Sequence, residues 1–323
     1  MTAEPGTRVL KADAGAIGAA VRCLASGGLV AFPTETVYGL GADAGNGEAV
    51  ARLYAAKGRP HFNPLIVHVS DLDAARTLAR FSEAAGKLAT AFWPGPLTLV
   101  LPRRPGAAVS DLALAGLDSI ALRVPAHPVA HELLAAFGKP IVAPSANRSG
   151  HVSPTSAAHV LGDLRGRIDM VIDAGACPVG VESSIVSCLG EPTLLRPGGV
   201  AREDIERVLG MTLADAPASD DAPLAPGMLA SHYAPKAKLR LDAQTAREGE
   251  ALLAFGPAAS GSARMTLNLS PRGDLVEAAA NLFSHLRALD ASGAKTIAVM
   301  KVPGEGLGEA INDRLKRAAA PKS

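Results

Sequence analysis

The sequence is short of cysteine, of aromatic side chains and of net charge. Its 323 residues include three cysteines, Cys23, Cys177 and Cys188, and no two have the C-x-x-C spacing of a zinc site or redox pair. Aromatic residues make up 3% of the chain, which argues against a single-strand nucleic-acid binder that stacks bases on rings. Lys and Arg number 32 and Asp and Glu 31, and the net charge of +1 argues against a protein that coats a nucleic-acid backbone, although a local basic patch stays possible.

Long apolar runs are also lacking. No uncharged run approaches the roughly 18 residues that a membrane-spanning helix needs. Near the N-terminus, Glu4, Arg8, Lys11 and Asp13 interrupt the sequence, and the apolar stretch of a signal peptide is not visible. We therefore expect a protein of the reducing cytoplasm with no membrane segment.

Apolar residues are plentiful enough for a large folded core. Hydrophobic residues make up 48% of the chain and charged residues 20%, which is typical of a globular protein. At roughly 150 residues per domain, this length predicts two domains. A chain of this size buries enough surface to fold without disulfides or structural metals.

Apolar runs alternate with amphipathic stretches, which is the pattern of an α/β protein. Helices are expected over residues 15–26, 48–57, 129–137, 275–289 and 307–318. Strands are expected over residues 29–32, 65–69, 97–101, 119–124, 140–143, 170–173, 185–186, 194–195, 251–255, 265–269 and 296–300.

A composition break separates two parts of the chain. Residues 213–235 are rich in Ala, Pro and Asp and include Pro217, Pro223, Pro226 and Pro235, which is typical of an interdomain linker. We predict a larger domain over residues 1–212, a linker over 213–235 and a small βαβ-type domain over 236–323.

No protein-bound metal site is predicted. His127 and His131 have a helical metal-ligand spacing, but Pro128 places His127 before the helix and no third ligand is evident. The phosphate-binding GKT arrangement is absent as well, because Ala294 separates Gly293 from Lys295.

Two polar motifs have ordinary structural interpretations when taken singly. Residues 33–39, with Thr34, follow an expected strand and would form a turn before the next element. Lys57, Gly58, Arg59 and Pro60 would close a helix, since cations suit its last turn, Gly its C′ position and Pro its end.

Arg123 and His68 lie within expected strands. A lone His such as His68 is more often a satisfied core residue than a ligand contact. Arg123 ends the run Ile-Ala-Leu-Arg-Val and needs a partner or an anion to offset its desolvation. Its planar guanidinium matches a carboxylate in bidentate fashion.

Further polar groups flank other expected strands. Residues 145–150, with Ser145 and Asn147, follow one strand, and ligands of open α/β sheets bind at the carboxyl ends of strands. Residues 182–184 and 196–199 repeat the pattern, although an ordinary turn explains each alone. Together the motifs supply four cations, with hydroxyl and amide groups between them: Lys57, Arg59, Arg123 and Arg196. Such a set suits a polyanion held beside a small zwitterion.

At this point the motifs resemble those of a known family, the YrdC-like threonylcarbamoyl-AMP synthases. The resemblance rests on five motifs in the same order, over about residues 10–210: Pro33-Thr34-Glu35-Thr36-Val37-Tyr38-Gly39-Leu40, Lys57-Gly58-Arg59-Pro60 with Asn63-Pro64-Leu65, Trp93-Pro94-Gly95-Pro96, Ala143-Pro144-Ser145-Ala146-Asn147 and Arg196-Pro197-Gly198. Residues 226–228, 231–235 and the C-terminal part are similar to the long two-domain form. The resemblance implies a YrdC-like twisted, open mixed sheet with helices, followed by a smaller Rossmann-like α/β domain.

The resemblance also implies a reaction and its participants. L-Threonine, bicarbonate and ATP would give threonylcarbamoyl-AMP and pyrophosphate, for the threonylcarbamoyladenosine modification of tRNA. Mg²⁺ would be bound mainly through the ATP phosphates. The partner would be the tRNA threonylcarbamoyl-transferase machinery, without stable binding of tRNA itself, and the linker could close over the site as a lid.

The family's site residues are carried over onto the matching positions of this chain. The resemblance implies a catalytic set of Lys57, Arg59, Ser145 and Asn147. It implies threonine-binding positions at Thr34, His68, Arg123, Ala143 and Ser183. It implies ATP-binding positions at Lys57, Arg59, Asn63, Ser145, Ser153, Arg196 and, on the linker, Tyr233.

Two other functions stay open at this stage. One is an RNA-binding module whose cationic face grips a duplex, which the charge and the few aromatic residues argue against. The other is an enzyme of the same fold that forms a carbamoyl-adenylate from ATP and carbamoyl phosphate without threonine.

Overall fold

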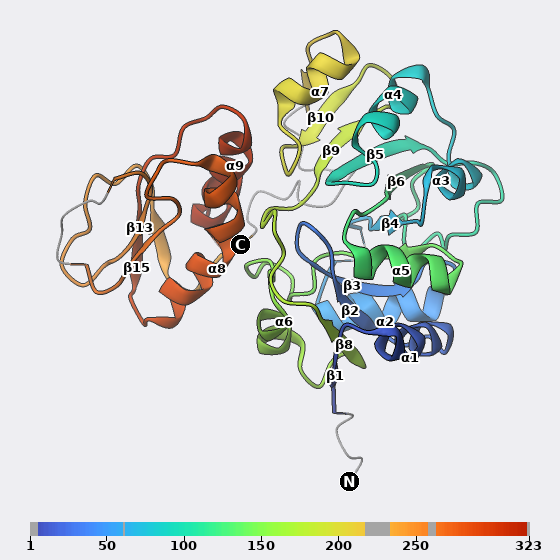
Figure 1. Ribbon diagram of the computed structural model, residues 1–323, viewed down its shortest axis with the longest axis horizontal. Helices are drawn as coiled ribbons and strands as arrows, with labels where there is room; N and C mark the ends of the chain where they lie inside the picture. The colour runs from blue at the N-terminus through green and yellow to red at the C-terminus, as the bar shows by residue number, and fades with distance from the viewer. Residues whose placement is uncertain (1–5, 61, 217–232, 258–262, 322–323) are drawn as a thin grey trace.

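The structure, a computed structural model, describes residues 6–60, 62–216, 233–257 and 263–321. Its larger part is built on an 11-stranded mixed sheet (Figure 1). In spatial order the strands are β1 (Arg8–Lys11), β8 (Met170–Asp173), β2 (Val30–Pro33), β3 (Tyr38–Asp43), β7 (Ile141–Val142), β4 (Ile66–His68), β6 (Ser119–Arg123), β5 (Leu97–Pro102), β9 (Ser184–Ser187), β10 (Thr193–Arg196) and β11 (Ala214–Asp215).

Helices cover both faces of this sheet. On β2, Val30 and Phe32 belong to one apolar cluster, with α1 (Ala14–Ala25) and α5 (Pro128–Phe137). Leu29 and Ala31 belong to the cluster of the opposite face, because successive residues of a strand point to opposite sides. That second cluster takes in buried residues of α2 (Gly47–Lys57), α3 (Leu72–Leu78), α4 (Glu83–Phe92), α6 (Ala157–Leu164) and α7 (Arg202–Leu209).

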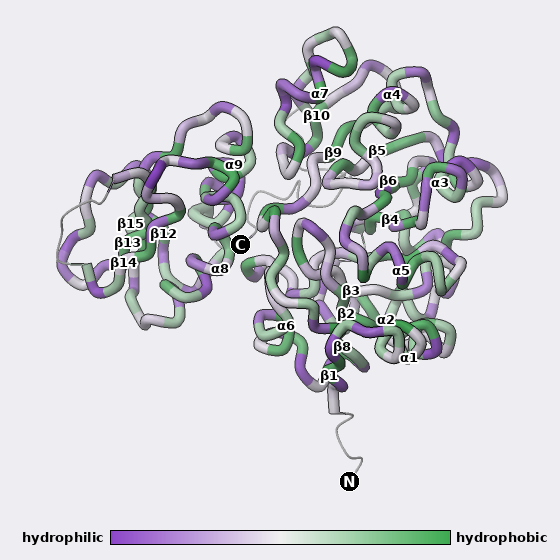
Figure 2. The backbone as a smooth tube through the Cα atoms, in the orientation of Figure 1, coloured by the Kyte–Doolittle hydropathy of each residue, from purple (hydrophilic) through white to green (hydrophobic). Residues whose placement is uncertain are grey.

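A second, smaller sheet is entirely parallel. Its strand order is β12 (Lys238–Arg240), β15 (Thr296–Val299), β13 (Ala251–Ala254) and β14 (Thr266–Asn268). The helices α8 (Leu275–Ala291) and α9 (Leu307–Ala319) pack on one face of it. The other face carries a small apolar cluster, mostly of Ala side chains, which includes Leu252, Ala254 and Ala298 of the strands themselves. Figure 2 shows the strands β5 and β13, one in each sheet, within hydrophobic stretches.

The helices α8 and α9 face the larger sheet unit (Figure 1). Val37, Val152 and Val181 of the larger unit share one apolar cluster with residues of α8 and α9. Gly180 lies so close to α8 that a Cβ added there would be 2.3 Å from the carbonyl oxygen of Ala279. The two units are therefore packed against each other through side chains and backbone.

The expected fold class is confirmed, and most predicted elements form. Residues 33–39 were predicted to form a turn, but only the first part of this motif is a turn. Tyr38 and Gly39 begin the strand β3. Strand propensity did not favour this segment, because β3 contains two glycines. Gly41 is needed there, because a Cβ at this position would lie 2.8 Å from the Phe32 ring.

The predicted domain boundaries stay a prediction. Residues 217–232, with Pro217, Pro223 and Pro226, are most of the predicted linker and lie outside the described residues, as does the 226–228 motif. At the start of the predicted linker, the short strand β11 pairs with β10. None of the described helices is long and apolar enough to cross a membrane.

Candidate active site

A cavity of about 40 Å³ lies over the centre of the larger sheet. On β4, Ile66 and His68 face this cavity, whereas Val67 belongs to the core of the opposite face. The cavity is lined by Val37, Arg59, Ile66, His68, Arg123, Ala143, Pro144, Ser145, Glu182, Ser183, Arg196 and Tyr233. Eight predicted site residues are therefore together in one place: Arg59, His68, Arg123, Ala143, Ser145, Ser183, Arg196 and Tyr233.

The other five predicted site residues are one hydrogen bond away from a lining residue. Thr34 Oγ1 donates to the carbonyl oxygen of Val37, and Ser153 Oγ donates to Glu182 Oε1 at 2.5 Å. The remaining three contacts are those of Lys57 with Ser145, Asn147 with Ser145, and Asn63 with Arg59. All five side chains are buried.

The strand-end argument explains only part of this arrangement. His68 and Arg123 are register partners at the carboxyl ends of the parallel strands β4 and β6. The strand β7 runs antiparallel to β4, so the loop with Ser145 and Asn147 does not follow from parallel strand ends. That loop is held at the cavity by pairing of its backbone with β3, through the bridge between Gly39 and Ser145.

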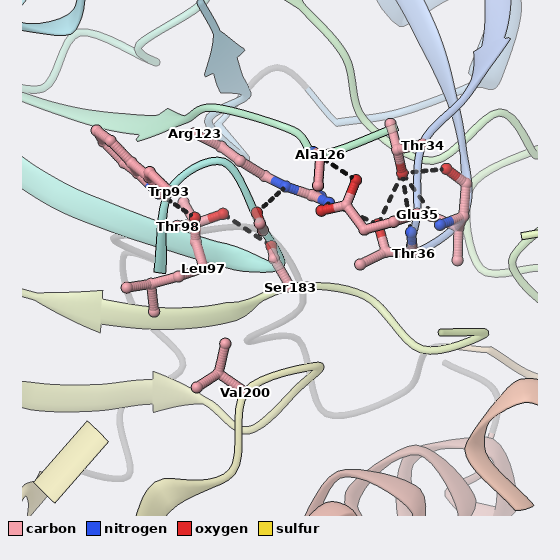
Figure 3. Close-up of polar contacts among 12 residues, drawn as sticks. Thr34, Glu35, Thr36, Trp93, Leu97, Thr98, Arg123, Ala126, Ser183 and Val200 are labelled. Carbon is pink, nitrogen blue, oxygen red and sulfur yellow. Dashed lines mark hydrogen bonds and ion pairs between the residues drawn. The ribbon is translucent and has the colours of Figure 1, made fainter. Parts of the chain in front are cut away.

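Arg123 is held on several sides although it is 4% exposed. Its Nη2 donates to Glu35 Oε1 at 2.6 Å and to Thr36 Oγ1 at 3.0 Å. Its Nε donates to the carbonyl oxygen of Gly95 at 3.2 Å, so the Trp93–Pro96 motif supplies an acceptor. Figure 3 shows the guanidinium directed at the Glu35 carboxylate. The partner that the sequence required for Arg123 is thus a carboxylate of the protein itself.

Glu35 is a site residue to which sequence reasoning gave no role. Its second oxygen accepts from the backbone N–H of Ala126 at 3.0 Å, just before α5. Burial alone would raise the pKa of Glu35, but the ion pair and hydrogen bond with Arg123 outweigh burial and hold the pKa below its usual value. Two features of the sequence could have indicated this role. Glu35 is the one carboxylate in the motif that contains Thr34, and Arg123 is an arginine in an apolar strand that needs an anion.

Ser183 and Arg196 form a second polar group at the cavity. Arg196 Nη2 donates to the carbonyl oxygen of Ser183 at 2.9 Å and to its Oγ at 3.2 Å. The Oγ of Ser183 is also 2.7 Å from Thr98 Oγ1 (Figure 3). A Cβ at Gly198 would lie 2.4 Å from three backbone atoms of residues 182–184. Glycine at this position therefore lets the 196–199 motif approach the Ser183 segment closely.

Lys57 and Arg59 are positioned by the way α2 ends. The helix ends at Lys57, and Gly58 in the left-handed conformation (φ 60°) turns the chain, as predicted. Lys57 Nζ donates to the carbonyl oxygens of Ser145 and Asn147, both at 2.5 Å. Arg59 Nη2 donates to the carbonyl oxygen of Pro64 at 3.0 Å. The two cations thus fix the loops on either side of the cavity.

Arginines outnumber carboxylates among the described residues that line the cavity. Arg59, Arg123 and Arg196 line it, whereas Glu182 is its one lining carboxylate in the described part of the chain. Burial lowers the pKa of Arg59 to about 10 and lowers that of Arg196. Burial, followed by the charge of Arg59, lowers the pKa of Lys57 well below its usual value. An anion bound here would relieve this cost.

Three buried polar atoms at the site lack a partner among the described residues. They are Asn63 Oδ1, His68 Nδ1 and Asn147 Oδ1. Burial, followed by the charge of Arg123, lowers the pKa of His68 to about 3, so its imidazole is neutral near pH 7. Buried polar groups are rarely left without a partner, which indicates that these atoms await a ligand or water.

Tyr233, on the predicted linker, is described and is buried at the cavity. Its ring stacks on Phe283 of α8 with 5.6 Å between ring centroids. The guanidinium carbon of Arg314, on α9, lies 5.2 Å from the centroid of the same ring. The linker residues 229–232, including His232, lie outside the described residues.

Among the described residues there is no group of three or more His, Cys, Asp or Glu that could hold a metal ion. Glu182 has both carboxylate oxygens engaged, one by Ser153 and one by Arg314 Nε at 2.8 Å. The described side chains at the cavity therefore do not form a ligand cage for Mg²⁺.

Two family descriptions match this chain in succession. The family described as "Telomere recombination" matches residues 22–198. The family described as "Threonylcarbamoyl-AMP synthase, C-terminal domain" matches residues 200–320.

Two relatives and one solved structure match over more than nine tenths of this chain, and another solved structure matches over a shorter part. The threonylcarbamoyl-AMP synthase of Bacillus subtilis is 43% identical over 94% of this chain and 92% of its own. That of Pyrococcus abyssi is 44% identical over 91% of each. The crystal structure of P. abyssi Sua5 complexed with L-threonine has a TM-score of 0.89 and 39% identity, over 97% of both chains. The crystal structure of E. coli YciO, with a TM-score of 0.53 and 22% identity over 60% of this chain and 94% of its own, is similar in fold alone.

The close approach at Gly198 can be tested by substitution. Gly198→Ala should lower the free energy of unfolding by about 1–3 kcal/mol, because the added Cβ displaces backbone. It should also reduce turnover, because residues 182–184 line the cavity. Gly190→Ala is the matched control, since no atom lies within 4 Å of a Cβ there. Urea unfolding measures the effect, and equal results for the two variants would contradict this packing.

The neutral, buried His68 should make stability depend on pH. Between the usual pKa of 6.5 and about 3, the unfolded chain binds a proton on His68 that the folded chain does not bind. The free energy of unfolding should therefore fall as pH falls through this window, by about 1.4 kcal/mol per pH unit from this group. His68→Asn should remove that part of the slope, whereas Gly190→Ala, which changes no titratable group and has open space for its Cβ, should leave it unchanged. Unfolding at pH 4.5, 5.5 and 6.5 gives the slopes, and an unchanged slope in His68→Asn would refute the assignment.

Proposed function

The chain belongs to the threonylcarbamoyl-AMP synthase family, and from this premise we propose how the cavity binds its substrates and carries out the reaction. As a member, it is an enzyme that uses L-threonine and ATP to form threonylcarbamoyl-AMP, in the service of tRNA modification. The proposals that follow concern the roles of individual residues, the source of the carbonyl group, the metal and the partners.

The observation that carries the proposal is the set of buried cations around one small cavity. Arg59, Arg123 and Arg196 line it, and Lys57 lies directly behind Ser145. A triphosphate and an amino-acid carboxylate would both bring negative charge to this set, in which Arg123 already has the carboxylate of Glu35 on one side. Guanidinium groups suit both ligands, because their planar donors match phosphate and carboxylate oxygens.

We assign threonine to the side of the cavity with Arg123 and His68. Arg123 binds the carboxylate of threonine, while Glu35 keeps its guanidinium in place. Ser183, Thr34 and the backbone near Ala143 complete this side, and the unpartnered His68 Nδ1 offers a hydrogen bond to a polar group of the amino acid. No carboxylate of the protein is assigned to the amine of threonine. The amine is therefore free to react.

ATP belongs on the side with Arg59 and Arg196. Lys57 and Arg59 act on the phosphates, and Ser145, Asn147, Asn63, Ser153 and Tyr233 contribute the remaining contacts of the nucleotide. Two of the three donors of Lys57 are used by carbonyl groups, which leaves one for a phosphate oxygen. A cavity of about 40 Å³ has room for a few water molecules and none for a nucleotide, so its lining side chains move apart when ATP enters.

The chemical step joins the two sides. The amine of threonine takes up the carbonyl carbon of bicarbonate, with loss of water, to give a carbamate. A carbamate oxygen attacks the α-phosphorus of ATP in line, the bond from this phosphorus to the bridging oxygen breaks, and pyrophosphate leaves. Such a transfer depends on positioning and on stabilisation of charge, which Lys57 and Arg59 provide without a covalent nucleophile.

The proposal extends to Mg²⁺ and to the partners of the enzyme. Because the described side chains form no cage for Mg²⁺, we propose that the ion enters bound to the phosphates of ATP. The adenylate passes to the tRNA threonylcarbamoyl-transferase machinery, and the protein does not itself hold tRNA. Its site cations are buried, so they cannot grip a nucleic-acid backbone, which argues against an RNA-binding module. A cytoplasmic location stays a prediction.

Pyrophosphate release tests the proposed reaction. With ATP, Mg²⁺, threonine and bicarbonate present, the protein should release pyrophosphate, and omission of either threonine or bicarbonate should abolish it. Release that persists without threonine would refute the proposal. Release that needs carbamoyl phosphate in place of threonine and bicarbonate would instead support the carbamoyl-adenylate alternative.

Arg123→Ala tests the threonine side separately. The threonine KM should rise at least about tenfold, equivalent to about 1.4 kcal/mol, with a much smaller rise for ATP. Arg123→Ala leaves the buried Glu35 carboxylate without its cation, which could by itself destabilise the protein. The double variant Glu35→Gln/Arg123→Ala is therefore measured as well, since it leaves no unpaired carboxylate at this position. Arg52→Ala is the control, since its ion pair with Asp169 lies on the surface. Equal rises in both KM values would count against a carboxylate-binding role.

A further inference from the structure

Arg314 belongs to the C-terminal helix α9 and is fully buried at the contact between the two units. Its Nε donates to Glu182 Oε2 at 2.8 Å, and its Nη1 pairs with the adjacent Asp313 at 2.6 Å. Glu182 belongs to the larger unit and lines the cavity. A guanidinium of the C-terminal unit thus contacts a wall residue of the candidate active site directly.

The contact extends to the nucleotide side of the cavity. The other oxygen of Glu182 accepts from Ser153, and the backbone carbonyl of Glu182 accepts from Gly199 N–H at 2.9 Å. Arg314 also packs over the ring of Tyr233, which stacks on Phe283 of α8. Of two residues assigned to ATP, Ser153 is therefore bonded to the carboxylate that Arg314 contacts, and Tyr233 is in contact with Arg314 itself.

Arg123, the residue assigned to the carboxylate of threonine, is held by different groups. Arg123 is fixed by Glu35, Thr36 and the carbonyl of Gly95, all of them in the larger unit. None of these contacts passes through Glu182 or α9. A change at Arg314 is therefore expected to affect one substrate far more than the other.

We propose that Arg314 is a positioning residue for ATP: through Glu182 and the Tyr233 ring, it makes the C-terminal unit part of the wall that binds the nucleotide. This inference rests on the proposed assignment of Ser153 and Tyr233 to ATP. Without the guanidinium, Glu182 loses the cation that is hydrogen-bonded to its Oε2, and this carboxylate turns toward other donors or takes up a proton. Ser153 and Tyr233 then lose their places at the cavity.

The experiment compares Arg314→Met with the wild-type protein over the full chain. ATP binding is measured by calorimetry without threonine, and KM for each substrate is measured by pyrophosphate release. We expect Kd and KM for ATP to rise about tenfold and KM for threonine to stay within about twofold. Thermal denaturation reports whether the variant is folded.

Arg202→Met is the matched control at the same interface. Arg202 Nη2 pairs with Glu309 of α9 at 2.7 Å, and neither residue lines the cavity. This variant loses an ion pair between the units and one positive charge, as Arg314→Met does. Because its ion pair is not at the cavity, its KM for ATP should match that of the wild type. A rise equal to that of Arg314→Met would reduce Arg314 to a general interface residue and overturn the proposal.

Glu182→Gln/Arg314→Met covers the case in which the single variant does not fold, because it leaves no unpaired buried charge. Its ATP affinity should be intermediate, at least about threefold weaker than wild type, since Tyr233 and Ser153 still lack the guanidinium. Unchanged ATP binding in a folded Arg314 variant would overturn the inference and leave the proposed function intact. Wild-type protein that releases no threonine-dependent pyrophosphate would instead refute the proposed function, while calorimetry still tests Arg314.

Discussion

Burial of positive charge is the constraint on which the rest of this site depends. Lys57, Arg59, Arg123 and Arg196 are each less than 9% exposed, and desolvation of a cation is costly unless acceptors surround it. The fold meets this cost mainly with backbone carbonyls, those of Ser145, Asn147, Asn63, Pro64, Gly95 and Ser183. The polar loops of the larger unit are thus ordered by the cations that they enclose.

Carbonyl groups offset desolvation without cancelling charge. Carboxylates do both: Arg123 has an ion pair with Glu35, whereas Lys57 and Arg59 donate to backbone carbonyls. The cavity thus has one side whose arginine is paired with a carboxylate of the protein, and a second side where Lys57 and Arg59 are bonded to carbonyl groups that leave their charge in place. A site built in this way favours a multiply charged ligand on the second side, and its empty state carries an electrostatic cost that the ligand removes.

Much of this arrangement could be predicted from the sequence. The alternation of apolar runs with amphipathic stretches and the Gly58 helix end predicted most of the elements, and Arg123 in an apolar strand indicated a partner or an anion beside it. Resemblance to a known family supplied the grouping of Thr34, Ser145 and Arg196, which are far apart in the chain and come together only through the order of strands. Glu35 and Glu182 could not be assigned roles, because their meaning depends on which cation the fold places beside each.

The role of Arg314 was equally out of reach of pattern reasoning. On an amphipathic helix an arginine is usually solvated, and its neighbours Asp313 and Arg317 suggest nothing else. Only the packing of α9 against the larger unit removes it from water. The strand β3 was missed for a related reason. Its two glycines have low strand propensity, whereas tertiary packing requires the strand.

The strand order of the larger sheet has a consequence for how the chain folds. The strand β8 lies between β1 and β2 and pairs with both, although about 140 to 160 residues separate them in sequence. The N-terminal strand and helix therefore cannot complete their sheet until more than half of the chain has left the ribosome. Pairings across such long separations carry a large loop-closure entropy and form slowly. The edge of β2 is consequently exposed during synthesis, at the stage when a nascent chain is most open to capture by chaperones or by other unpaired strands.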